Sequence, residues 1–177
     1  MARSSLRLLL TTGLLLVAPL AARAQAQDPR TGPHVRTDDA TLRKLIERGL
    51  AQSPTFRGIV SRIDQLPGLV YLVPSRCGAL SGLSACMDHD VKVRGGYRFL
   101  RVNVMPGDPA FRQLPLLAHE LQHALEVLSD DSAMCQETVT QLYERIGVPK
   151  GMGNFETEAA LRVQETVVNE LRKAGRR

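Results

Sequence analysis

The sequence lacks tryptophan and contains few aromatic residues and few cysteines. Aromatic residues make up 4% of the 177 positions, and cysteine occurs 3 times. Three cysteines allow at most one intramolecular disulfide, which excludes a small fold stapled by several bridges. No apolar run reaches the ~18 residues that a membrane-spanning helix needs. With 44% hydrophobic residues, the chain can bury one core, and we expect a single globular domain.

Acidic residues are absent from the first 24 positions, which hold three arginines. The remaining residues carry 20 basic and 18 acidic side chains, so most of the formal net charge of +5 comes from this first segment. Such a balance gives no electrostatic signature of nucleic acid binding, and we expect no nucleic acid partner. We interpret the basic cluster at the C-terminus as a solvated helix end that complements the helix dipole; it comprises Arg172, Lys173, Arg176 and Arg177.

Residues 1–24 have the pattern of a secretory signal peptide. Arg3 and Arg7 precede the apolar run 8–20, and the small residues that favour cleavage follow it. The run is too short for a membrane anchor. We expect cleavage near Ala24 or Ala26 and an exported mature chain, periplasmic or secreted, without a membrane span.

The rest of the chain divides into residues 25–37, predicted to be a flexible leader, and one domain at residues 38–177. Hydrophobic periodicity and turn residues predict helices at 42–50, 56–63, 115–127, 132–146 and 155–173, and strands at 69–73, 91–94 and 97–104. This order favours an α+β fold, in which a small sheet with a hairpin packs on a central helix and on C-terminal helices.

Gly95 and Gly96 are predicted to form the tight turn of that hairpin. With this turn, Val93 lies opposite Arg98 and Lys92 lies opposite Phe99. The register places five apolar residues on one face of the hairpin: Val91, Val93, Leu100, Val102 and Val104.

Two of the cysteines are close enough in sequence for a disulfide. Cys77 and Cys86 bracket a glycine- and serine-rich stretch, and a bridge between them would contribute about 2–3 kcal/mol. An exported chain meets the oxidising conditions that such a bridge requires. Cys135 falls in a predicted helix and is interpreted as a buried thiol.

The motif with the clearest chemistry is H-E-x-x-H at residues 119–123. His119 and His123 are one helical turn apart, so two imidazole nitrogens can bind one Zn²⁺ ion. Glu120 follows the first histidine and can take a proton from water and return it to a leaving amine. The alternative is that these are two ordinary helix histidines beside a solvated glutamate. The apolar residues around the motif and the export signal favour the metal site.

A third metal ligand is expected among the carboxylates, and Glu156 is favoured. In the predicted helix 155–173 it is the one acid on the apolar stripe, and a buried carboxylate needs a partner. The alternative is a carboxylate stabilised by the helix dipole. Glu158 and Glu137 lie on polar faces and are predicted to be solvated. Glu126 shares the histidine face but lies too far along the helix to reach the same ion, so we interpret it as orienting a ligand histidine.

These motifs resemble those of the zincin metallopeptidases, in the subgroup with two histidines and a downstream glutamate. Besides the H-E-x-x-H motif, Glu156-Thr157-Glu158-Ala159-Ala160 is similar to a family helix whose first glutamate is the third zinc ligand. Ala160 departs from the family pattern, which has Asp or Asn there. The resemblance implies a minimal zincin-like domain and an exported peptidase that acts on a peptide or protein substrate. A non-catalytic envelope protein with a structural or vestigial zinc site is the alternative.

The resemblance also implies an edge strand beside the active-site helix, which would hold an extended peptide, and Tyr97–Val104 is the candidate. A donor for the oxyanion is expected in addition to the metal. Tyr97, Tyr143, His89 and Arg98 are all possible donors. His89 by itself is more typical of a surface turn.

Overall fold

The computed structural model describes residues 32–77, 83–151 and 154–176, so the predicted signal peptide lies outside the described residues. The elements in chain order are β1 (Val35–Arg36), α1 (Ala40–Gln52), α2 (Pro54–Ile63), β2 (Gly68–Pro74), β3 (Ala85–Met87), β4 (Lys92–Arg94), β5 (Tyr97–Val104), α3 (Ala110–Ser129), α4 (Gln136–Ile146), β6 (Val148–Gly151), β7 (Asn154–Glu156) and α5 (Glu158–Ala174).

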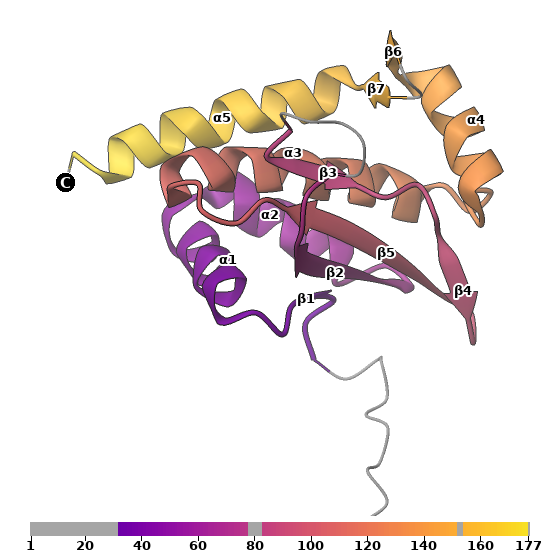
Figure 1. The fold of residues 1–177 in the computed structure, drawn as a ribbon, viewed down its shortest axis with the longest axis horizontal. Helices are drawn as coiled ribbons and strands as arrows, with labels where there is room; N and C mark the ends of the chain where they lie inside the picture. Colours follow the sequence, from indigo (N-terminus) through magenta and orange to yellow (C-terminus); the bar gives the residue numbers. More distant parts are fainter. Residues whose placement is uncertain (1–31, 78–82, 152–153, 177) are drawn as a thin grey trace, which may run out of the picture.

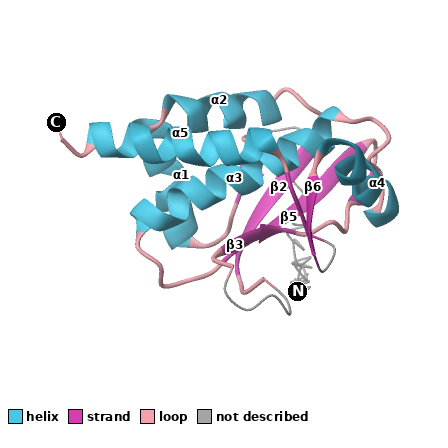
Figure 2. Cartoon of the chain, turned by 90° about the horizontal axis from the view of Figure 1, so that it is seen from above, coloured by secondary structure: helices cyan, strands magenta, loops and turns pink. Residues whose placement is uncertain are grey.

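The main sheet is mixed, with the strand order β1-β2-β5-β3, and β4 also pairs with β5. Strands β1, β2 and β5 are parallel, whereas β3 and β4 run antiparallel to β5. Strands β6 and β7 form a separate small hairpin. Helix α3 lies between the main sheet and α5 (Figure 1), and α5 runs along α3 when the molecule is seen from above (Figure 2). The predicted α+β class is confirmed.

The core is centred on α3, which is apolar on the side that faces the sheet and on the side that faces α5. The largest fully buried side chains are Tyr143, Phe56, Ile63, Leu72, Leu100, Leu114, Leu117, Leu121, Leu125, Leu128, Val70 and Val102. No helix among the described residues has both the length and the apolar character needed to cross a membrane.

The first two helices begin two residues before the predicted ranges 42–50 and 56–63, each directly after a capping residue. The Asp39 side chain accepts hydrogen bonds from the backbone N–H groups of Thr41 and Leu42, both at 2.8 Å. Ser53 caps α2 in the same way, and Pro54 occupies the first helical position, where its missing N–H costs nothing.

The glycine hairpin has the predicted register. Gly95 and Gly96 both have positive φ, as a tight two-residue turn requires, and Val93 pairs with Arg98. Of the five apolar residues predicted to share one face, Val91, Leu100, Val102 and Val104 are buried, whereas Val93 is 44% exposed. The short strand β4 lies at the lower right of the molecule, away from α1 and α2 (Figure 1), and all three of its residues are exposed.

The prediction that Tyr97–Val104 forms the edge strand is also wrong. Strand β5 pairs with β2 on one side and with β3 and β4 on the other, so it lies inside the sheet. The edge strand next to α3 is β3. It has only three residues, Ala85–Met87, which is too short to show an alternating pattern in the sequence.

The last three helices begin at other residues than predicted. Helix α3 begins at Ala110 and contains Pro115 in its interior. The carbonyl that Pro115 leaves unbonded belongs to Phe111, which is exposed and can be hydrated. Helix α4 begins at Gln136 because Asp130 instead organises a turn with Ser132.

Helix α5 begins at Glu158 and not at Phe155. Thr157 is its N-cap, and the hydroxyl of Thr157 accepts a hydrogen bond from the Ala160 N–H at 3.1 Å. Residues 154–156 form strand β7 instead. Glu156 therefore lies at the end of a strand, just before the helix on which it was expected.

The predicted flexible leader ends earlier than residue 37. Val35–Arg36 forms β1 and pairs with β2. His34 is buried, and its backbone N–H donates to the Asp64 carboxylate at 2.7 Å. The folded domain thus includes residues that lack any hydrophobic periodicity.

Arg98 is a buried cation that caps the C-terminal end of α3. Its guanidinium group donates to the carbonyl oxygens of Val127, Leu128 and Asp130 at 2.6–3.1 Å. Carbonyl groups at a helix C-terminus have no partner within the helix, so these bonds fix where α3 ends.

Replacing Arg98 with methionine should destabilise the protein, because these buried carbonyl groups lose their donors. We expect the free energy of unfolding, measured by urea denaturation, to fall by about 2–4 kcal/mol. The control is Arg94→Met, an exposed position on β4, which should change it by less than ~0.5 kcal/mol. Equal stability of the two variants would contradict the capping role.

Candidate metal centre

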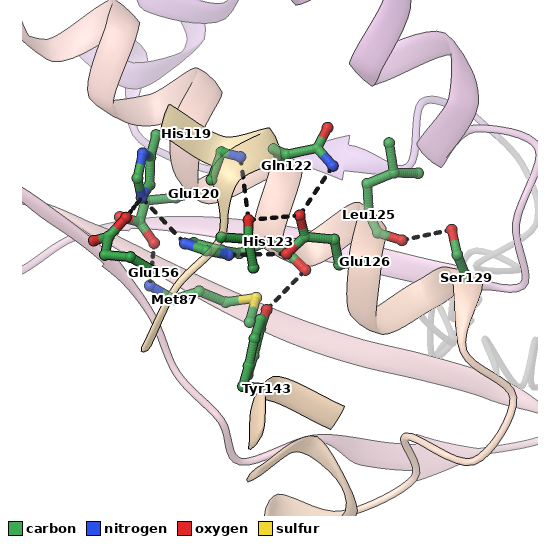
Figure 3. A network of polar contacts seen from close by, with 12 residues as sticks. Met87, His119, Glu120, Gln122, His123, Leu125, Glu126, Ser129, Tyr143 and Glu156 are labelled. Atoms are coloured by element: carbon green, nitrogen blue, oxygen red, sulfur yellow. Dashed lines mark hydrogen bonds and ion pairs between the residues drawn. The ribbon is translucent and has the colours of Figure 1, made fainter. Parts of the chain in front are cut away.

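Helix α3 carries both histidines of the H-E-x-x-H motif near its middle. His119 and His123 are buried on the same side of the helix, one turn apart. Their Nε2 atoms are 3.1 Å apart, and the two rings meet edge to face (Figure 3). The helix therefore presents two nitrogen ligands at one point.

Glu156 reaches the same point from the end of β7. Its Oε2 atom is 3.2 Å from His119 Nε2. One ligand atom from each of His119, His123 and Glu156 lies within 4.8 Å of the others. Ligand atoms around a small tetrahedral cation are roughly 3.3 Å apart. The structure thus brings together the three residues predicted as ligands, and this group could hold a metal ion.

The polar atoms of this cluster fit a bound cation. Glu156 Oε2 is buried and has no hydrogen-bond partner among the described residues, which is unfavourable for a carboxylate oxygen unless a charge compensates it. The two facing Nε2 atoms of His119 and His123 can share only one proton between them. A divalent cation among the three atoms would satisfy all of them.

Glu126 lies on the far side of His123, where the sequence analysis places it as an orienting residue. Its Oε2 is 3.0 Å from Nδ1 of His123. Its Oε1 accepts hydrogen bonds from the Thr157 hydroxyl at 2.8 Å and from Gln122 at 3.2 Å. Thr157 directly follows Glu156 in the chain. The Glu126 carboxylate therefore links α3, which carries His119 and His123, to the residue next to Glu156.

The pKa values of Glu126 and His123 shift in opposite directions. Burial alone raises the pKa of Glu126, but the hydrogen bond and the charge of His123 outweigh it and lower the pKa below its usual value. Burial alone lowers the pKa of His123, but Glu126 and the nearby carboxylates outweigh it and raise the pKa. An ionised Glu126 therefore holds a proton on Nδ1 and leaves Nε2 available for a metal.

His119 is in a different environment. Burial and the neighbouring His123 lower its pKa to about 4, so the ring is neutral at neutral pH. The charge of Glu126 opposes this shift most, followed by Gln164 and the backbone of Ala160. The buried Nδ1 atom of His119 has no hydrogen-bond partner among the described residues. Ala160 occupies the position where the resembling family has Asp or Asn, and Gln164 lies one turn later on the same helix.

Glu120 lies beside this cluster and reaches from α3 toward Met87 at the edge of the sheet (Figure 3). Its Oε2 accepts a hydrogen bond from the Met87 backbone N–H of β3 at 2.8 Å. Burial raises the pKa of Glu120 to about 7, although His123 and the Met87 N–H oppose the shift. The carboxyl group therefore changes protonation near neutral pH, as a residue that both accepts and donates protons requires.

A pocket of about 240 Å³ gives access to these groups, and Glu120, His119, His123 and Glu156 all line it. The pocket wall also includes His89, whose ring stacks on Tyr143 with the centroids 5.2 Å apart.

Of the four possible oxyanion donors, two line the pocket and two lie elsewhere. Arg98 is occupied at the end of α3, and Tyr97 lies against His34 with the ring centroids 6.1 Å apart. Tyr143 and His89 both line the pocket. The Tyr143 hydroxyl donates to the His123 carbonyl at 3.1 Å. The interpretation of His89 as a plain surface residue is wrong. No sequence signal could place it, because the short strand before it was not predicted.

Cys77 and Cys86 form the predicted disulfide, and Cys86 is the central residue of β3 and lines the pocket. The bridge therefore anchors the strand that holds Glu120. Cys135, in contrast, is exposed at the N-cap of α4, so its interpretation as a buried thiol is wrong. In the sequence it lay inside the helix predicted at 132–146, whereas α4 begins after it.

No protein-family model, curated protein or solved structure matches this chain. The geometry of the pocket and of its ionisable residues is therefore the basis for a functional proposal.

Replacing Glu126 with glutamine should weaken metal binding without removing a ligand. The amide cannot hold the Nδ1 proton of His123 as strongly, and the loss of such partners costs roughly 10- to 100-fold in metal affinity. Zn²⁺ affinity measured by competition with a chelator should fall by this factor. The control, Glu137→Gln, removes an exposed carboxylate from α4 and should leave the affinity unchanged. Wild-type affinity in Glu126→Gln would show that the contact is unimportant for the metal.

The raised pKa of Glu120 should make the stability of the metal-free protein depend on pH. Ionised Glu120 is unfavourable in the folded state, so the cost is absent below pH 4.5 and complete above about 7. Glu120→Gln mimics the protonated form. In urea unfolding with chelator present, its free energy of unfolding should match wild type at pH 4 and exceed it by about 3 kcal/mol at pH 8. A difference that is the same at both pH values would contradict the shift.

Proposed function

We propose that this protein is an exported zinc-dependent peptidase that hydrolyses peptide bonds. The observation that supports this is a proton-transferring carboxyl group, Glu120, in an open pocket beside a cluster of two imidazoles and one carboxylate. Two nitrogen ligands and one oxygen ligand suit Zn²⁺. Three protein ligands leave one position open, as in catalytic zinc sites, whereas structural sites use four protein ligands.

His119, His123 and Glu156 would hold the zinc ion, which would polarise the scissile carbonyl group and lower the pKa of water to about 7. Glu120 then acts as general base and takes a proton from the attacking water. The same carboxyl group, now protonated, gives the proton to the nitrogen of the leaving amine. The Met87 N–H holds Oε2 in place during both transfers, while Oε1 has no hydrogen-bond partner among the described residues.

Strand β3 is the proposed binding edge for the peptide. The Asp88 N–H donates to the Arg101 carbonyl and the Met105 N–H donates to the Ser84 carbonyl, so these groups point toward β5. Because backbone groups alternate in direction along a strand, those of the intervening Ala85 point away from β5, toward the pocket. An extended peptide can pair with this free edge.

His89 is the proposed donor to the oxyanion. Its ring lines the pocket, and burial together with the neighbouring His123 lowers its pKa, so it is a neutral N–H donor at neutral pH. Tyr143, the other residue at this place, already uses its hydroxyl hydrogen on the His123 carbonyl.

The proposed export rests on the signal-peptide pattern of residues 1–24 and on the disulfide, which is typical of oxidising compartments. A metal site closed by a fourth protein ligand would favour the alternative of a non-catalytic envelope protein. Glu126, the acid that was considered for closing it, is instead held on the Nδ1 side of His123.

Glu120→Gln should retain zinc and lose hydrolysis, because the amide cannot accept the proton of the attacking water. We expect full zinc content by elemental analysis and roughly 10³-fold slower cleavage of a fluorescence-quenched random peptide library. His119→Ala should lose the zinc as well. Glu137→Gln should behave as wild type in both measurements.

Wild-type cleavage by the zinc-loaded Glu120→Gln protein would contradict the mechanism. Full zinc content in the wild type without cleavage of any library peptide would instead support the non-catalytic alternative.

A further inference from the structure

A second concave surface adjoins the metal pocket along α3 and α5. This groove has a volume of about 650 Å³ and shares Ser84, Leu116 and Gln164 with the metal pocket. The two therefore adjoin at these three residues. From there the lining of the groove reaches Arg112, near the beginning of α3, and Gly175, just after the end of α5. These two helix ends lie at the same end of the molecule (Figure 1).

Three arginines from three different helices line the groove: Arg48 of α1, Arg112 of α3 and Arg172 of α5. All three are exposed. The only polar side-chain contact found for them within the described chain is a hydrogen bond from Arg48 to the neutral Gln52. Asp108 is the single acid of the lining. The three arginines outnumber this single acid, so the groove carries an excess of positive charge.

The floor between these arginines is apolar and comprises Phe111, Pro115, Leu116, Val168 and Leu171. The Phe111 side chain is 61% exposed, and the Arg112 guanidinium lies 5.7 Å from the centre of its ring. Guanidinium groups bind carboxylates with two parallel hydrogen bonds. An apolar floor beneath them suits a carboxylate attached to an apolar chain.

Interpreting the C-terminal basic cluster as a solvated helix end accounts for Arg172 but not for its neighbours in the groove. Arg48 and Arg112 reach the same surface from α1 and from the beginning of α3. The beginning of α3 also has neither a side-chain cap nor an acid in its first turn, so the positive end of its dipole adds to the potential there.

The direction of β3 indicates which part of a peptide would enter the groove. Antiparallel pairing is the more stable arrangement, and a peptide paired in this way runs from Met87 toward Ser84. Because Ser84 is shared with the groove, the carboxyl side of the peptide enters it. Arg112 precedes His119 by two turns of α3, roughly 10 Å along the helix, which is about three residues of extended chain.

We propose that this groove, through Arg112 and Arg172, binds a carboxylate of the substrate about three residues to the carboxyl side of the cleaved bond. The carboxylate is either the C-terminus of the peptide or an acidic side chain. This inference deepens the proposed function and rests on it, because the substrate is taken to be a peptide that is paired with β3.

The test is peptide binding to the zinc-loaded mature chain carrying Glu120→Gln, so that no peptide is cleaved. Three fluorescein-labelled hexapeptides of alanine and leucine are compared by fluorescence anisotropy. One ends in a free carboxylate, one in an amide, and one in an amide preceded by aspartate. We expect at least one carboxylate peptide to bind about tenfold more tightly than the neutral amide.

This preference should disappear when Arg112→Gln and Arg172→Gln are added together. It should persist with Arg62→Gln, which removes an exposed arginine of α2 that lines neither the groove nor the metal pocket. If only the peptide with the free carboxylate binds more tightly, the groove binds the peptide C-terminus. If both carboxylate peptides bind more tightly, the groove also binds acidic side chains. Either result supports the proposal.

The proposal fails if the three peptides bind equally, if none binds at millimolar concentration, or if the preference survives in the double variant. It also fails if decanoate, a carboxylate without a peptide backbone, binds more tightly than the peptides, because the occupant is then a lipid. Hydrolysis by the wild type is measured separately. Cleavage without carboxylate preference would reject only the proposed carboxylate binding by the groove. Carboxylate preference without cleavage would reject only the proposed peptidase activity.

Discussion

The burial of α3 on two sides is the constraint on which the rest of the structure depends. The sheet covers one side of this helix and α5 covers the other, so polar groups in its middle cannot be hydrated freely. His119, Glu120, His123 and Glu126 nevertheless lie within two turns of it. Each such group must find a partner inside the protein. Some of these partners lie on α3 itself, and the others, Met87, Glu156 and Thr157, come from elements that are distant in sequence.

The connection between Glu126 and Thr157 shows how these elements are held in register. One carboxylate accepts a hydrogen bond from the residue that begins α5 and also orients a histidine of α3. The position of Glu156, immediately before Thr157, thereby depends on the same contact that positions His123. The Glu126 side chain thus helps to position groups on both α3 and α5.

Local sequence rules predicted the parts of the site that a single element determines. The spacing of His119 and His123 and the register around Gly95 depend on helix and hairpin geometry alone. Glu156 was selected correctly as the third residue of the cluster, but on the assumption that it lies in a helix. Residues 154–156 instead form a strand of a two-stranded hairpin, and Thr157 caps the helix that follows. The position of β3, and with it His89, depends on pairing between distant strands, which no periodicity within three residues can show. The arginine-lined groove likewise needs three helices to converge.

The disulfide makes the structure of the pocket wall depend on the oxidation of Cys77 and Cys86. Strand β3 is held to the sheet by its pairing with β5 and by the bridge from Cys86 to Cys77, and its Met87 N–H fixes the carboxylate of Glu120. With the two thiols reduced, this wall would lose its covalent link and keep only its pairing with β5 and its contacts with α3. The position of the Glu120 carboxylate is thereby coupled to the oxidation of Cys77 and Cys86.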